Sequence, residues 1–275
     1  MCILEPEEKE TSVKYKLYKP SNDLSDFVKY YWQFELDSIP QEIHANRVIP
    51  SGELQIIFHY KTPFRELDRY HQSFVQPQCL ICGQQTDYKD IFSVQAAGML
   101  AVVFHPYALR AFFPAPVNEF TDQSISLDNF FRTETKDLQE RIIEASDIYA
   151  RILLVENFLL NRLSISNSFS VAKEAVNMIT KMGGQLTVSE AANKLNVSKR
   201  QFERIFLANV GISPKKFGRI VRFSHSIKLL TKPIPLTTLA YEAGYSDQSH
   251  LIHDFKAFAG LSPKAFARQT CHTPE

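Results

Sequence analysis

Two patterns of apolar residues divide the chain into a first part with strands and a second part with helices. Between residues 28 and 105, apolar side chains alternate with polar ones or run through short segments rich in β-branched and aromatic residues. Both patterns predict β-strands, and the segments that show them are residues 28–35, 54–60, 79–82 and 100–105. From Leu127 onward the apolar residues recur every three or four positions, which predicts helices. Because Pro, Gly and Asp turns separate the strands, the sequence indicates a β-sandwich or barrel followed by helices.

The second part contains an internal repeat. Residues 187–219 recur at residues 236–268, shifted by 49 positions. The matching pairs include Ala191 and Ala240, Phe206 and Phe255, Gly211 and Gly260, Pro214 and Pro263, and Phe217 and Phe266. Each copy predicts two helices joined by a tight turn and a third helix that starts at the proline. A unit of this size cannot bury a complete core, so we expect the two copies to pack around a shared helix.

The second helix of each copy separates an apolar face from a polar one. Ser198 and Asp247 are placed to cap these helices, and Gly211 and Gly260 to end them. A short turn followed by a helix with an exposed polar face is the helix-turn-helix pattern, in which that helix enters the DNA major groove. The positions predicted to contact bases are Arg200, Glu203, Arg204, Gln248, Ser249, Ile252 and His253. Since arginine forks suit guanine, we expect the first copy, with two arginines, to carry most of the discrimination.

The distribution of charge supports a nucleic-acid partner. The whole chain has a net charge of +1, but residues 170–275 hold 15 Lys and Arg against 7 Asp and Glu, whereas residues 1–169 hold 16 against 23. Positive charge therefore gathers on the repeat, as binding to the phosphates of double-stranded DNA requires. The residues predicted to contact phosphates are Lys199, Lys215, Lys216, Arg219, Arg222 and Lys264. The helix from Pro214 through Leu230 would span on the order of 26 Å, which suits successive major grooves about 34 Å apart.

Residues 170–269 resemble the C-terminal DNA-binding domain of the AraC/XylS transcription regulators. The segments that carry the resemblance are SKRQFERIFLANVGISPKKFGRIVRFSHSIKLL and PIPLTTLAYEAGYSDQSHLIHDFKAFAGLSPKAFAR. The resemblance implies two helix-turn-helix units on one long helix, preceded by a cupin-like β-barrel sensor, dimerising helices and a flexible tether. It also implies an unknown small-molecule effector and RNA polymerase as partners. Three N-terminal segments, LSDFVKYYWQFE, RVIPSGELQIIFHY and VVFHPYALRAFF, are similar to those of an uncharacterised subgroup of the family.

Together these patterns predict an α+β multidomain chain. We expect an N-terminal β-rich sensor domain at residues 1–126, a helical dimerisation or coupling segment at 127–163, a linker at 164–169 and a DNA-binding domain at 170–275. The apolar stripe of the helical segment is predicted to form the interface of a homodimer, and it consists of Ile148, Ile152, Val155 and Leu159. The alternative is that this stripe packs against the barrel of its own chain.

The first part shows no sequence pattern typical of an enzyme or a metal site. Cys79 and Cys82 have the spacing of half a zinc site or a redox pair, but a strand would point them to opposite sides. His59, His71 and His105 lack the close spacing of cupin metal ligands. We therefore expect no cofactor, no metal and no enzymatic activity. One alternative is a barrel enzyme, or a metal or redox protein, with an accessory DNA-binding domain. Another is a constitutive DNA-binding protein whose barrel has only a structural role. The lack of a signal peptide and of a long apolar run predicts a cytoplasmic protein that does not enter a membrane.

Overall fold

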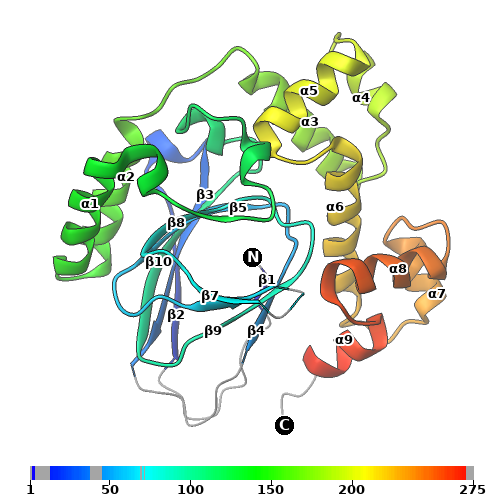
Figure 1. The fold of residues 1–275 in the computed structure, drawn as a ribbon. Coiled ribbons are helices and arrows are strands. Elements are labelled where there is room, and N and C mark those ends of the chain that lie inside the picture. The colour runs from blue at the N-terminus through cyan, green and yellow to red at the C-terminus, as the bar shows by residue number, and fades with distance from the viewer. Residues whose placement is uncertain (1, 4–12, 38–44, 69, 71, 271–275) are drawn as a thin grey trace.

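The chain folds into two sheets and nine α-helices within the residues that the structure describes. The computed structural model describes residues 2–3, 13–37, 45–68, 70 and 72–270. Figure 1 shows the sheets at the centre, with α1 and α2 on one side and α3 to α9 on the other. An antiparallel β-sheet domain is therefore followed by an all-helical C-terminal domain, which confirms the predicted fold class.

The larger sheet has six strands, and every pairing in it is antiparallel. In spatial order the strands are β11 (Ser124–Ser126), β8 (Cys79–Cys82), β5 (Leu54–His59), β10 (Ala97–Phe104), β3 (Val28–Leu36) and β2 (Val13–Tyr18). The four strands expected from the sequence all lie in this sheet. The smaller sheet consists, in order, of β1 (Cys2–Ile3), β4 (Asn46–Ile49), β9 (Lys89–Phe92), β6 (Arg65–Leu67) and β7 (Ser73–Val75).

The central strands of the larger sheet are buried on both faces, which explains why they are mostly apolar. Every residue of β5 and β10 is buried. Side chains such as Trp32 and Ile57 belong to one apolar cluster between the sheets, whereas Tyr31 and Ile56 belong to the cluster that includes the helices. Cys79 lies in the helix-side cluster and Cys82 packs against the other. The two cysteines therefore point to opposite sides, as predicted.

Two helices cover the larger sheet, and the second of them corrects the predicted dimer contact. They are α1 (Asp128–Glu144) and α2 (Ile148–Leu160). Within α2, Val155 and Leu159 are 0% exposed, Ile148 is buried and Ile152 packs partly buried on the same core. The chain's own β-sheet domain thus covers the stripe that was predicted to meet a second copy, because the stripe faces β10. The outward face of α2 instead carries Tyr149, which is 66% exposed.

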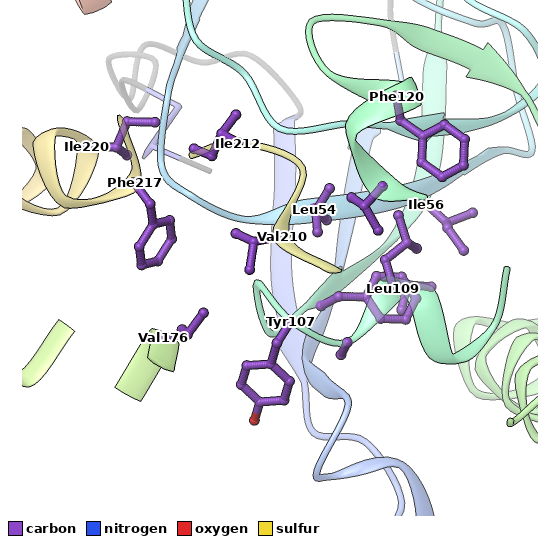
Figure 2. Packing of buried hydrophobic residues seen from close by; sticks show 14 of the residues in the cluster. Leu54, Ile56, Tyr107, Leu109, Phe120, Val176, Val210, Ile212, Phe217 and Ile220 are labelled. Atoms are coloured by element: carbon purple, nitrogen blue, oxygen red, sulfur yellow. The ribbon is translucent and has the colours of Figure 1, made fainter. Parts of the chain in front are cut away.

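The apolar core continues from the β-sheet domain into the helical domain. Figure 2 shows side chains of β5 and of the two 3-10 helices η2 (Leu109–Ala111) and η3 (Val117–Phe120) beside Val210, Ile212 and Phe217 of the helical domain. The backbone N–H of Ser164, which precedes the helical domain, donates a hydrogen bond of 2.8 Å to the Ala111 carbonyl. The connecting segment implied by the resemblance is thus bonded to the β-sheet domain.

The helical domain contains seven helices in its described residues. They are α3 (Phe169–Lys181), α4 (Val188–Lys194), α5 (Lys199–Val210), α6 (Pro214–Leu229), α7 (Leu236–Glu242), α8 (Gln248–Ala259) and α9 (Pro263–Thr270). The long helix expected between the two copies is α6. It ends one residue earlier than the sequence suggests and carries α4 and α5 towards one end and α7 and α8 towards the other (Figure 1).

Candidate nucleic-acid interface

The first helix-turn-helix unit is α4 and α5, and its local sequence determines both helix ends. Thr187 and Glu190 form a capping box at the start of α4. The Ser198 hydroxyl accepts a hydrogen bond of 3.2 Å from the Gln201 N–H at the start of α5. Gly211 ends α5 with a φ of 96°, a left-handed conformation that favours glycine. Phe202, Phe206 and Val210 of α5 are buried, so the opposite face is left to solvent.

The second unit, α7 and α8, repeats this construction. The Asp247 carboxylate accepts a hydrogen bond of 2.9 Å from the His250 N–H and caps α8, as predicted. Gly260 ends α8 with a φ of 69°. Leu251, Phe255 and Phe258 fill the core behind the helix. Both recognition helices therefore have caps and C-terminal glycines at the positions that the sequence indicates.

The two turns differ in length, which corrects the pairing of the first helices. Four residues, 195–198, separate α4 from α5, whereas five, 243–247, separate α7 from α8. The Val197 N–H bonds to the Ala192 carbonyl, and the Tyr245 N–H bonds in the same way to the Ala240 carbonyl. Ala240 is thus the counterpart of Ala192, not of Ala191 as a constant shift of 49 implied. The identical pairs are densest just after the recognition helices, at 211–219 and 260–268, so they fixed a shift of 49 and concealed the extra residue.

The predicted base-contact residues lie on the outward faces of α5 and α8. Arg200, Glu203 and Arg204 are exposed on α5. On α8, Ser249 and His253 are exposed, and Gln248 and Ile252 are partly exposed. The structure thus brings each set together on one helix face, with the apolar residues of the same helix on the other. Their contact with bases stays a prediction.

The predicted phosphate contacts divide into two groups. Lys199, Lys215 and Lys264 are exposed. Arg219, by contrast, is ion-paired with Asp254 at 2.6 Å, and Arg222 donates a hydrogen bond of 2.6 Å to the Gly184 carbonyl. These two side chains therefore have roles within the fold that sequence reasoning did not foresee.

Lys216 differs from its exposed neighbour Lys215. Its ammonium lies 5.2 Å from the centre of the Phe258 ring, in a cation–π arrangement. Partial burial and then the nearby Arg219 guanidinium lower the pKa of Lys216. The side chain therefore packs against the second unit instead of extending into solvent.

A basic cleft lies between α6 and the second unit. Its volume is about 490 Å³. The residues that line it are Lys215, Arg219, Arg222, Gly244, Tyr245, Ser246, His250, His253 and Asp254. Since the three cations outnumber the single carboxylate, the cleft attracts anions such as a DNA phosphate.

The β-sheet domain contacts the C-terminal ends of both recognition helices. The Thr121 hydroxyl donates a hydrogen bond of 2.7 Å to the Gly211 carbonyl at the end of α5. The Arg47 guanidinium donates one of 3.0 Å to the Ala259 carbonyl at the end of α8. Sequence reasoning missed both residues, because their partners are main-chain carbonyls that leave no signal in the sequence.

The interior between the sheets holds buried polar side chains but little space. The Glu66 carboxylate accepts hydrogen bonds of 2.9 Å from Gln76, Lys89 and Ser124, and Gln76 in turn contacts His59. Burial lowers the pKa of His59 to about 4. The adjoining cavity has a volume of about 30 Å³, which is the volume of about one water molecule.

Two further observations concern the described residues only. No group of three or more His, Cys, Asp or Glu side chains among them is placed to hold a metal ion. His71, a histidine considered from the sequence, lies outside this part of the chain. None of the helices that the structure describes combines the length and the apolar character needed to span a membrane.

Two helix-turn-helix units on one connecting helix define a tandem helix-turn-helix protein. Comparison with protein families agrees: residues 191–269 match the model "Helix-turn-helix domain", and residues 16–126 match a domain of unknown function, DUF6597. Residues 191–269 thus form a helix-turn-helix domain of the AraC type, and residues 16–126 form a DUF6597 domain.

Other proteins are similar to this chain over part or most of its length. The Msm operon regulatory protein of Streptococcus mutans is 29% identical over 154 residues, which is 54% of each protein. Similar solved structures include ToxT from Vibrio cholerae, at 10% identity over 94% of this chain and 98% of that one, with a TM-score of 0.49. They also include the C-terminal domain of AraT from Geobacillus stearothermophilus, at 26% identity over 40% of this chain and 92% of that one, with a TM-score of 0.36.

Proposed function

We propose that this protein is a sequence-specific DNA-binding transcription regulator that reads two adjacent DNA elements, one with α5 and one with α8. The observation that carries the proposal is the pair of capped recognition helices attached to one connecting helix. At 1.5 Å per residue, the 16 residues of α6 span about 24 Å. With a unit at each end, this length suits successive major grooves about 34 Å apart.

In this proposal the two recognition helices have different tasks. On α5, Arg200 and Arg204 offer bidentate forks for guanine, and Glu203 between them accepts from cytosine or orients the arginines. On α8, Gln248 suits adenine, whereas Ser249, Ile252 and His253 offer weaker polar or apolar contacts. The first unit therefore supplies most of the base discrimination.

The phosphate contacts of this proposal are Lys199, Lys215 and Lys264, which are exposed on the helical domain. The other three predicted residues have partners within the fold instead: Arg219 and Lys216 contact α8, and Arg222 bonds to the Gly184 carbonyl. The cleft that Lys215 shares with His250 and His253 supports the passage of one DNA strand between α6 and α8.

The β-sheet domain receives the regulatory signal in this proposal. Val48 and Ile49 of β4 line the small cavity between the sheets, and Arg47 on the same strand bonds to the end of α8. Lys89 and Ile91 of β9 line the cavity as well, and Asp90 between them pairs with Arg47. A small molecule larger than water would separate the sheets and shift the contact with α8, which couples the effector to DNA reading.

Association with a second copy and with RNA polymerase completes the proposed function. Because the stripe of α2 is covered by the chain's own β-sheet domain, a second copy would use another surface. Two linked copies would bind a repeated operator more tightly through the higher effective concentration of the second copy.

Selection of binding sites from a pool of random double-stranded DNA tests the proposal. We expect a two-part consensus, with Arg200→Ala and Arg204→Ala each weakening its binding by about 1–3 kcal/mol and relaxing one or two adjacent positions. Arg132→Ala, which removes an exposed arginine from α1, is the matched control and should leave binding unchanged. If the wild-type protein enriches no sequence, the proposal is wrong. If the two arginine variants lose as much affinity for random DNA as for the selected site, the arginines contact phosphates instead of bases.

A further inference from the structure

Asp254 is a buried carboxylate on the second recognition helix. Its side chain is only 6% exposed, and it directly follows His253, whose side chain is 72% exposed on the outward face of α8. A charge in this position needs a partner, because burial of an unpaired carboxylate is costly. The partner therefore matters for how α8 is held.

The partner comes from the connecting helix. Arg219 of α6 donates from both Nε and Nη2 to the same oxygen of Asp254, at 3.2 and 2.6 Å. The guanidinium also lies 5.3 Å from the centre of the Phe258 ring, one turn further along α8. Arg219 thus contacts two successive turns of the inward face of α8.

The first unit has no such pair at the corresponding position. Counting back 49 residues along the recognition helix, Asp254 corresponds to Ile205, which is partly buried and packs on the apolar core. Apolar contacts are non-directional, whereas a guanidinium and a carboxylate fix direction as well as distance. The orientation of α8 therefore depends on a directional contact that α5 does not use.

The ion pair of Arg219 and Asp254 also determines how much positive charge the cleft offers to DNA. The Arg219 side chain is 27% exposed and lines the cleft together with Lys215 and Arg222. A phosphate in the cleft would be near enough to attract Arg219, but Asp254 already neutralises it. The carboxylate thus withholds one cation from sequence-independent binding.

We infer that Arg219 and Asp254 form a positioning pair that orients α8 for reading the second DNA element, and that Asp254 at the same time limits non-specific attraction to phosphates. The inference rests on the proposed DNA-binding function. A buried ion pair of this kind contributes little net stability, whereas losing one partner is costly, which suits a role in orientation.

The test compares Asp254→Asn with Arg219→Gln on a selected two-part site and on random DNA. Both variants should lose about tenfold in discrimination, confined to the element read by α8. Their effects on random DNA should differ. Asp254→Asn should bind it several-fold more tightly, with the slope of log K against log salt steeper by about 0.9, because Arg219 is free to bind a phosphate. Arg219→Gln should show neither change.

A charge-swapped double variant, Arg219→Asp with Asp254→Arg, separates orientation from net charge. It keeps the net charge of the cleft, so it should bind random DNA like the wild type and recover part of the discrimination at the second element. Thermal unfolding identifies variants that fail to fold. If a single variant fails to fold, the double variant alone tests the positioning role, through its discrimination at the second element. Full discrimination by folded Asp254→Asn would overturn the positioning role, and unchanged binding to random DNA would overturn the limiting role. If wild-type protein selects no site at all, the proposed function fails instead.

Discussion

Arg47 of β4 donates a hydrogen bond of 3.0 Å to the Ala259 carbonyl, so a strand of the β-sheet domain is bonded to the end of the second recognition helix. The guanidinium is held for this contact by the Asp90 carboxylate, which it meets with two nitrogens at 2.8 Å, and by the Tyr88 ring, 4.1 Å away. Thr121 makes the corresponding contact with Gly211 at the end of the first recognition helix. One domain therefore holds both helices at their C-terminal ends.

Removing these two contacts should loosen the two units separately. Arg47→Ala deletes a hydrogen bond and leaves Asp90 without its cation, so we expect a loss of about 1–3 kcal/mol in unfolding free energy. Hydrogen exchange should rise in α8 and α9 but not in α5. Thr121→Val removes only a hydroxyl and should cost about 0.5–1.5 kcal/mol, with faster exchange at the end of α5. If exchange rose equally in α5 and α8 in both variants, the two contacts would not hold the two helices individually.

The C-terminal glycines offer a matched pair of substitutions. Gly260 has a φ of 69°, and an added Cβ would lie 2.6 Å from the Tyr88 ring. Gly183 has a φ of 58°, but no atom lies within 4 Å of the position of its Cβ. Gly183→Ala should therefore lose only about 1 kcal/mol of stability through backbone strain, whereas Gly260→Ala should lose more. In a Tyr88→Ala background, Gly260→Ala should cost no more than Gly183→Ala does; equal melting temperatures for the two single glycine variants would refute the steric explanation.

Much of the helical domain could be predicted because its signals are local. Ser198, Asp247, Gly211 and Gly260 act on the helices next to them, so the sequence alone identified both recognition helices. The extra residue in the second turn was missed because most of the identical pairs that set the shift lie after that turn, at 206–219 and 255–268. Periodicity also identified the apolar face of α2 but not what covers it, since the covering strand β10 is distant in sequence.

Contacts between distant segments could not be predicted from the sequence. A single arginine on an amphipathic helix fits a solvated charge, a phosphate contact and an ion pair equally well. Only the packing of α6 against α8 assigns Arg219 to Asp254. The bonds that Arg47 and Thr121 make to carbonyls likewise depend on how the two domains meet.

The buried His59 should make the stability of the protein depend on pH. Burial lowers its pKa from 6.5 to about 4, so between these values the unfolded chain binds a proton that the folded chain does not. The unfolding free energy should therefore be highest above pH 6.5 and fall by about 3 kcal/mol as the pH drops to 4. His59→Gln removes the titrating group and should flatten this part of the profile in urea titrations. A profile with the same slope in the variant would show that other groups cause it.

The burial of the α2 stripe gives the last prediction. Leu159 is 0% exposed in the core between α2 and the larger sheet, whereas Leu153 on the same helix is 59% exposed. Leu159→Ala should therefore cost about 2–5 kcal/mol in unfolding free energy through the lost burial and the cavity it leaves. Leu153→Ala should change stability by less than about 0.5 kcal/mol. The double variant Ile152→Glu with Leu159→Glu completes the test. Two charges in the protein's own core should unfold the β-sheet domain, and light scattering shows whether the variant has instead changed from dimer to monomer. A folded double variant that has changed only from dimer to monomer would restore the stripe as a contact between copies.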